Sequence, residues 1–247
     1  MFIRKWESVL EKHIEGFFNK KFASDLQLAE IEKYLEREMQ LKKKKRDGAS
    51  YLPNKYLLYI SQEDATRLQP DALLADLYTS LIRQTILQDC LIDEALTIEF
   101  RTDAGLAKGS CEVKSFYEFA AAEPLPEEIE AHTIVMEKPA LAEPGVLLAE
   151  HKAAALLIAA GPDRDSYLEL GEKQVHIGRR EENEFLLTDK NASRLHAYIA
   201  FEKYRHVLYD AGSLNGTYVN GEKIAERRLK YGDEIQIGNT MILYEVI

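Results

Sequence analysis

The sequence predicts a multi-domain protein, in which an acidic, proline-containing linker joins an N-terminal α+β domain to a C-terminal all-β sandwich. The chain of 247 residues is long enough for two ordinary hydrophobic cores. Apolar residues follow helical spacing early in the chain and form short, evenly spaced runs late in it, and a proline-rich segment lies between the two patterns. We therefore expect domains at 1–120 and 151–247, with a linker at 121–150.

Two amphipathic helices are expected first. Apolar residues at intervals of three and four indicate one helix at 2–18. Ser24 and Gln27 are typical of the start of a second helix, whose apolar face continues to Met39. We interpret the basic run at 42–46 as a solvated helix end, because the negative end of the helix dipole favours cations there. A contact with a membrane or a nucleic acid is the alternative.

The rest of the first domain reads as strand, helix, strand, strand. An apolar and aromatic run at 56–60 predicts a buried strand, and Ser61 is a candidate N-cap for the helix that follows it. Helical spacing then extends to about residue 88. The runs at 95–100 and 110–119 flank a turn-prone connection, so we expect them to form an antiparallel hairpin.

The remaining chain divides into a tether and a sandwich. Residues 121–150 hold four of the seven prolines, many glutamates and a single lysine, which predicts a semi-rigid, extended linker. From residue 152 onward, short apolar runs alternate with turns of Gly, Asn and Asp. That pattern is typical of an all-β sandwich.

Composition and charge exclude several classes of protein. A net charge of −10 argues against a nucleic-acid footprint over the whole molecule, because phosphate backbones bind clustered Lys and Arg. No apolar run reaches membrane-spanning length and no signal-peptide pattern opens the chain, so we expect a cytoplasmic protein. Cys90 and Cys111 lack the spacing of a zinc site or a disulfide framework, so we expect reduced, buried thiols, with no metal and no cofactor.

Three short polar groups stand out in the second domain by their order and spacing. They are Gly178-Arg179, Ser193-Arg194-Leu195-His196 and Asn215-Gly216-Thr217, the last of which is followed by Val219-Asn220-Gly221. Together they resemble the forkhead-associated (FHA) domain, a family of phosphothreonine-binding modules built on an eleven-stranded β-sandwich. The resemblance covers about residues 152–247.

The chemistry of these residues agrees with that family. A phosphothreonine carries about −1.5 to −2 charges and three acceptor oxygens, so it needs a planar cation and short neutral donors. The resemblance implies that Arg179 and Ser193 contact the phosphate, that Arg194 adds a contact, and that Asn215 binds the ligand backbone. Asn191 then lies where the family reads the third residue after the phosphothreonine. Its neutral amide gives no strong preference for an acidic ligand.

Other residues of the motif are expected to support the site. Gly178 has no side chain and lets the strand end approach its neighbour closely. His196 is interpreted as a structural brace, and Gly216 and Thr217 as parts of a turn. Leu214 departs from the family, because many members have a polar residue there that can assist the phosphate.

The first domain is similar to the N-terminal domain of bacterial FhaA-type proteins over roughly residues 1–118. This resemblance implies an adaptor downstream of a bacterial Ser/Thr kinase, in cell-envelope growth or division. Its partners would be phosphothreonine-containing proteins, either a kinase substrate or the kinase itself, and some of them would be membrane-bound. Thr133 in the linker is a candidate phosphosite that could form an internal, autoinhibitory ligand.

Two other functions are weighed against this one. Asp189, Ser193 and His196 contain the residue types of a hydrolase triad, but they crowd into eight positions, and no nucleophile elbow, GxGxxG or P-loop is present. We therefore expect no enzyme. The alternative is a protein associated with RNA or another nucleic acid through its N-terminal domain, although that domain lacks a GxxG clamp and the aromatic RNP pattern.

Overall fold

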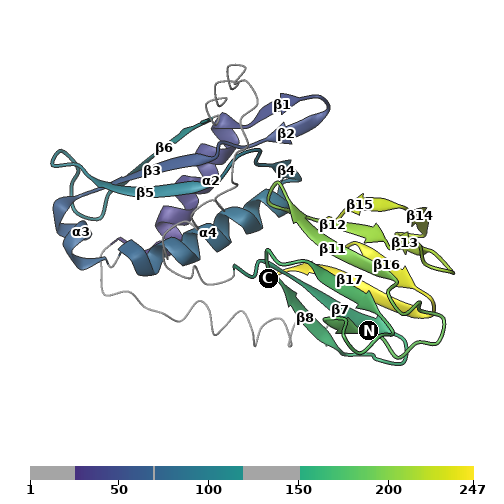
Figure 1. Ribbon diagram of the computed structural model, residues 1–247. Coiled ribbons are helices and arrows are strands. Elements are labelled where there is room, and N and C mark those ends of the chain that lie inside the picture. Colours follow the sequence, from purple (N-terminus) through teal and green to yellow (C-terminus); the bar gives the residue numbers. More distant parts are fainter. Residues whose placement is uncertain (1–25, 69, 119–150) are drawn as a thin grey trace, which may run out of the picture.

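The computed structural model describes residues 26–68, 70–118 and 151–247. The expected helix at 2–18, the linker and Thr133 lie outside these described residues. Figure 1 shows two bodies, an N-terminal one of helices and strands and a C-terminal one made of strands alone. The predicted combination of an α+β domain and an all-β sandwich is therefore confirmed.

The first described helix, α2 (Leu28–Lys42), begins as its sequence suggests. Gln27 is the N-cap, and its backbone N–H donates to the Glu30 carboxylate at 3.3 Å. This contact satisfies one of the donors that a helix start leaves without a partner. One apolar face of α2 is buried against the domain core.

Strand β3 (Lys55–Ile60) is the centre of a three-stranded sheet. It pairs in parallel with β5 (Thr97–Thr102) and antiparallel with β6 (Cys111–Phe116). The prediction that the last two strands form a hairpin with each other was therefore wrong, although both strands exist. β3 is the most buried of the three and takes the central position, where both of its edges are hydrogen-bonded.

Two further helices follow β3. The Ser61 hydroxyl accepts a hydrogen bond from the Asp64 N–H at 3.1 Å, so the predicted N-cap of α3 (Gln62–Arg67) is confirmed. α4 (Pro70–Leu87) continues as the spacing predicted. Helices α2 and α4 pack together, and their buried faces share one hydrophobic cluster with the sheet.

A small second sheet corrects the interpretation of the basic run. Helix α2 ends at Lys42, and β1 (Lys44–Arg46) pairs with β2 (Ala49–Tyr51) across a turn at Asp47, while β2 also pairs with β4 (Cys90–Leu91). The turn residues Asp47 and Gly48 have φ angles of 51° and 78°, the left-handed conformation that hairpin turns of this kind require. Three of the five residues of the run thus form an exposed strand and not a helix end.

The C-terminal domain is a sandwich of two sheets. Its strands are β7 (Ala154–Ala160), β8 (Tyr167–Leu170), β9 (Val175–Gly178), β10 (Phe185–Leu186), β11 (Ala197–Glu202), β12 (Arg205–Asp210), β13 (Thr217–Val219), β14 (Glu222–Ile224), β15 (Glu226–Arg228), β16 (Glu234–Ile237) and β17 (Thr240–Val246). A five-stranded sheet has the order β10-β9-β11-β12-β15, and a six-stranded sheet has the order β14-β13-β16-β17-β7-β8. The number of strands agrees with the family that the motif indicated.

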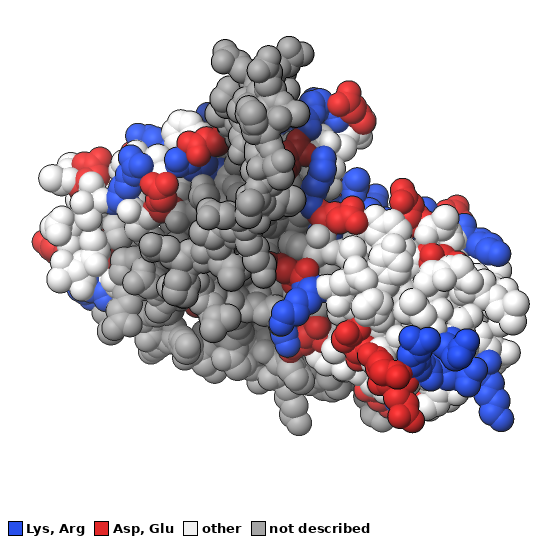
Figure 2. Space-filling view, viewed as in Figure 1, with Lys and Arg blue, Asp and Glu red and all other residues white. Residues whose placement is uncertain are grey.

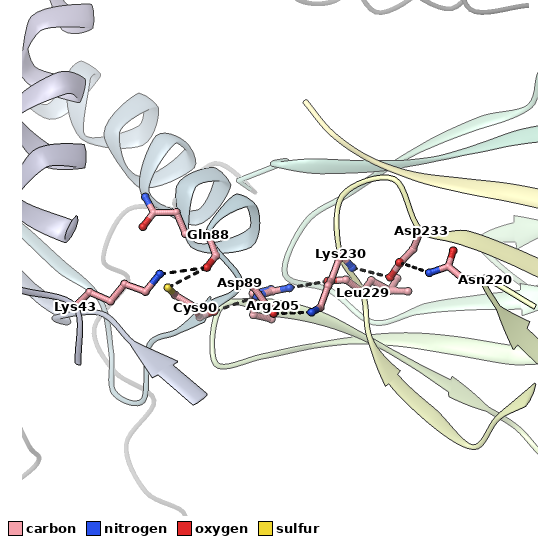
Figure 3. Close-up of polar contacts among 9 residues, drawn as sticks. All are labelled: Lys43, Gln88, Asp89, Cys90, Arg205, Asn220, Leu229, Lys230 and Asp233. Atoms are coloured by element: carbon pink, nitrogen blue, oxygen red, sulfur yellow. Dashed lines mark hydrogen bonds and ion pairs between the residues drawn. The ribbon is translucent and has the colours of Figure 1, made fainter. Parts of the chain in front are cut away.

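The two domains pack directly against each other. Ile82 and Ile86, near the end of α4, are buried in the hydrophobic core cluster of the sandwich. The Ile92 N–H donates to the Lys203 carbonyl at 3.2 Å, which joins the two backbones. Figure 3 shows the polar side of this contact, where Arg205 of β12 reaches the residues that follow α4.

Membrane-spanning helices and metal-binding clusters are absent from the described residues. In the part of the chain that the structure describes, no helix is long and apolar enough to span a membrane. Within the same residues, no cluster of His, Cys, Asp and Glu side chains is placed to hold a metal ion. Cys90 and Cys111 are buried free thiols, and the Sγ of Cys90 donates to the Gln88 carbonyl at 3.3 Å.

Candidate functional site

Three loops of the sandwich carry the residues that the sequence singles out. The first loop (179–184) joins β9 to β10, the second loop (187–196) joins β10 to β11, and the third loop (211–216) joins β12 to β13. Arg179 lies in the first loop, Asn191, Ser193 and Arg194 in the second, and Asn215 in the third.

Gly178 allows the first and second loops to touch. A β-carbon at this position would lie 2.6 Å from the Arg194 carbonyl oxygen and 2.8 Å from that of Ser193. Because these atoms belong to the backbone, they could not move aside for a side chain. The Arg179 N–H donates to the Ser193 carbonyl at 3.0 Å, so the close approach places these two residues side by side.

Arg179 and Ser193 keep their donors available. The Nε of Arg179 makes a long contact of 3.4 Å with the Ala192 carbonyl, which orients the exposed guanidinium without using its terminal nitrogens. The Ser193 hydroxyl oxygen accepts the Leu214 N–H at 3.1 Å, so its own proton remains free to donate. A planar cation thus lies beside a free hydroxyl donor.

Asn215 links the third loop to the second. Its Nδ2 donates to the Asn191 carbonyl at 2.8 Å, which fixes the orientation of the amide and leaves Oδ1 as an acceptor. The side chain of Asn191 is exposed next to this contact. Leu214 precedes Asn215 and is 89% exposed, so its apolar side chain lies in solvent at the rim of the site.

His196 is fully buried between the second and third loops. Its Nδ1 accepts the Ser193 N–H at 2.9 Å, so Nε2 carries the proton and faces the Gly216 carbonyl at 3.2 Å. Burial lowers the pKa of His196, which keeps the ring neutral and preserves both contacts. The ring therefore joins the two loops.

Asp210 organises the third loop, a role that the sequence analysis missed. One carboxylate oxygen accepts the Ser213 and Thr217 hydroxyls, and the other accepts the N–H groups of Gly212 and Ser213. Burial acts to raise the pKa of Asp210, but these hydrogen bonds outweigh it and hold the pKa below its usual range. An Asp two residues before Gly-Ser is a recognisable turn signal that could have identified it.

Asp189 organises the second loop, as Asp210 organises the third. It is 3% exposed, and its carboxylate accepts the N–H groups of Asn191 and Asn239 at 2.9 and 2.6 Å. The second contact ties the loop to the turn between β16 and β17. Asp189 therefore fixes the conformation of the second loop without being exposed in the site.

The geometry does not form a hydrolytic triad. His196 Nδ1 is bonded to the backbone of Ser193 and not to its hydroxyl, and Nε2 faces a backbone carbonyl. Asp189 makes its hydrogen bonds to other groups. Neither His196 nor Asp189 is therefore aligned as a general base for the Ser193 hydroxyl, as a triad requires.

The charges around the loops suit an anionic ligand. Arg180 pairs with Glu182 at 3.9 Å, but neither Arg179 nor Arg194 makes an ion pair with any residue that the structure describes. Figure 2 shows a cluster of basic side chains on the sandwich, beside a strip of acidic ones. Unpaired cations, a hydroxyl donor and an amide acceptor together can bind an anion that is attached to a peptide.

Comparison with known proteins identifies both halves of the chain. Residues 3–114 match the family model of the FhaA N-terminal domain, and residues 175–238 match that of the FHA domain. The chain is an FhaA-type protein. The matched FHA segment contains all three loops of the site.

Curated relatives of this FhaA-type protein match about a third of the chain. The glycogen accumulation regulator GarA of Mycolicibacterium smegmatis is 36% identical over 92 residues, which are 37% of this chain and 58% of that protein. The oxoglutarate dehydrogenase inhibitor of Corynebacterium efficiens is also 36% identical over 92 residues, which are 65% of its length. The chain thus spans between half and two thirds of the length of these relatives.

Solved structures match a similar share of the FhaA-type chain. The FHA domain of FhaA in complex with the intracellular domain of Rv3910 is 31% identical and has a TM-score of 0.36, with 38% of this chain and 100% of that chain covered. Mycobacterium tuberculosis EmbR in complex with a low affinity phosphopeptide is 29% identical, also with a TM-score of 0.36, and 39% and 25% of the two chains are covered.

Proposed function

We propose that this protein is a phosphothreonine-reading signalling adaptor and not an enzyme. The observation that supports this best is the pairing of Arg179 with Ser193. One supplies an exposed guanidinium and the other a hydroxyl with a free proton, on two loops that are hydrogen-bonded to each other. Charge-assisted bonds of this kind recognise a phosphate monoester.

The ligand would be an extended peptide around the phosphothreonine. Asn215 has an acceptor oxygen for the ligand backbone, and Asn191 lies beside it to contact a later side chain. Arg194 adds a second unpaired cation next to Ser193. The membership of residues 175–238 in the FHA family and the regulatory roles in the names of two relatives support the same function.

Titration of the full chain with matched peptides tests this function. A phosphothreonine peptide should bind, whereas the unphosphorylated peptide should not, as measured by isothermal titration calorimetry. Arg179→Ala and Ser193→Ala should each weaken binding at least about tenfold, because each removes a charge-assisted hydrogen bond. Arg228→Ala, an exposed arginine of β15, is the matched control and should leave the affinity unchanged. Equal binding of both peptides would refute the proposal.

The kinase context is a further part of the proposal. We infer that the partners are proteins phosphorylated by a bacterial Ser/Thr kinase, in the setting of cell-envelope growth or division that FhaA-type architecture suggests. Co-expression with an active kinase should let the full chain capture a threonine-phosphorylated protein, and an inactive kinase should abolish the capture. If cells that lack the protein show a defect in cell shape, the wild type should correct that defect and Arg179→Ala should not.

A further inference from the structure

Lys223 lies against the third loop, although neither the motif nor the family match singles it out. It belongs to β14, which forms a hairpin with β13 and places Lys223 opposite Tyr218. A β-carbon added to Gly216 would lie 2.5 Å from Cε and 3.0 Å from Nζ of Lys223. The lysine side chain therefore extends across Gly216, the residue that follows Asn215.

The absence of a side chain at position 216 makes this arrangement possible. Gly216 has a φ of 83°, in the left-handed region, and the space above it is filled by the methylene stem of Lys223. Gly216 is buried while Lys223 remains exposed, so the end of the lysine packs on the turn and the residue stays accessible to solvent. Packing the stem reduces the conformational entropy that binding would otherwise cost.

The ammonium of Lys223 has no acidic partner among the described residues. Its neighbour Glu222 pairs with Arg227 at 3.3 Å. Two other lysines of the same domain are paired, since Lys152 lies 3.3 Å from Glu169 and Lys203 lies 2.7 Å from Asp93. In a chain with a net charge of −10, an unpaired cation beside the binding loops leaves a position for an acidic group of a ligand.

We infer that Lys223 is a specificity-determining residue, which favours phosphothreonine ligands with an Asp or Glu side chain near the phosphothreonine. This inference rests on the proposed function. Arg179 and Ser193 would bind the phosphate, and Asn215 would hold the ligand backbone next to Lys223. An acidic side chain on that stretch of the ligand then meets a cation that is already positioned. Asn191, with its neutral amide, provides no such attraction.

A peptide scan on the full chain tests the inference. The parent peptide has a central phosphothreonine flanked by alanines, and each variant carries one Asp at a position up to four residues before or after it. For the wild type, Asp at one or more positions should strengthen binding about two- to fivefold, the size expected of an exposed ion pair. This gain should shrink at high salt, because exposed charge pairs are screened.

Substitutions then assign the gain to Lys223. Lys223→Met keeps the packed stem and removes the charge, so it should abolish the gain from Asp and leave the affinity for the parent peptide unchanged. Lys223→Glu should turn the gain into a loss. Lys152→Met, a lysine that is already paired with Glu169 on another strand, is the matched control and should retain the gain.

Three outcomes would overturn the inference. In the first, no Asp position strengthens binding to the wild type. In the second, Lys223→Met weakens binding to the parent and to the Asp peptides equally, which would mean that Lys223 contacts the phosphate or stabilises the fold. In the third, the gain survives Lys223→Met. Failure of the wild type to bind any phosphopeptide would instead refute the proposed function, so the two failures are distinguishable.

Discussion

The guanidinium of Arg205, a fully buried residue of the sandwich, lies 2.8 Å from the carboxylate of Asp89 in the N-terminal domain. Lys230 reaches the other oxygen of the same carboxylate at 2.7 Å, as Figure 3 shows. Burial acts to raise the pKa of Asp89, but the hydrogen bonds from Lys230 and Arg205 lower it overall. A charge of one domain is thus neutralised by the other.

Asp89→Ala should destabilise the full chain by about 1–3 kcal/mol, because it leaves the buried Arg205 without its counter-ion. Lys230→Ala removes an exposed partner of the same carboxylate and should cost less than about 1 kcal/mol. Urea unfolding followed by circular dichroism measures both. The double variant Asp89→Ala with Arg205→Met removes both charges and should be more stable than Asp89→Ala alone. If it is less stable, the buried charge is not the cause.

The pH dependence of stability should report on His206. This ring is 1% exposed between the Tyr244 hydroxyl and the Gly171 carbonyl, and burial lowers the pKa of His206 from 6.5 to about 4. The pKa of His206 is lower in the folded state than in the unfolded state. The contribution of His206 to the free energy of unfolding is therefore complete above pH 6.5 and is lost as the pH falls toward 4. The loss is on the order of 3 kcal/mol.

His206→Gln separates this contribution from that of the carboxylates. The variant cannot titrate, so its free energy of unfolding should fall less steeply between pH 6.5 and 4 than that of the wild type. The His206 ring should also remain neutral at pH 5 in an NMR titration. Parallel pH profiles of the two proteins would contradict the assignment.

Gly178→Ala should abolish phosphopeptide binding. The added carbon would meet the backbone of Ser193 and Arg194 and push the first two loops apart, at a cost of at least about 2 kcal/mol. Gly232→Ala is the matched control, because Gly232 has a φ of 82° but open space around it. It should cost about 1 kcal/mol and leave the affinity unchanged. Similar effects of both variants would show that backbone strain, and not the contact between loops, matters at position 178.

Periodicity in the sequence predicted most elements but not all of their pairings. Residues 56–60 read correctly as a buried strand, yet nothing local showed that β3 would separate β5 from β6. Strand order depends on contacts between distant segments, which spacing within a segment does not encode. The hairpin of β1 and β2 was missed because its lysines resembled a helix end, although Asp47-Gly48 is a hairpin turn signal.

The site was predictable where residues follow one another in a motif. The residues that support the site were harder to predict, because they act through side-chain contacts between distant positions. Asp189 accepts a hydrogen bond from Asn239, and Asp210 accepts one from Thr217. Arg205 gave no signal at all, since an arginine at the start of a strand normally faces water. Its burial follows from the packing of a second domain, which a single-domain pattern cannot show.

The burial of Ile82 and Ile86 in the sandwich core has a consequence for any partner that touches both domains. A reader module on a loose tether could swing to meet its ligand, but one that shares a core with its neighbour presents the ligand at a set distance and angle. The protein would therefore favour partners in which the distance between the phosphothreonine and a second contact site matches the distance between the two domain surfaces. Flexibility in the encounter would then have to come from the partner.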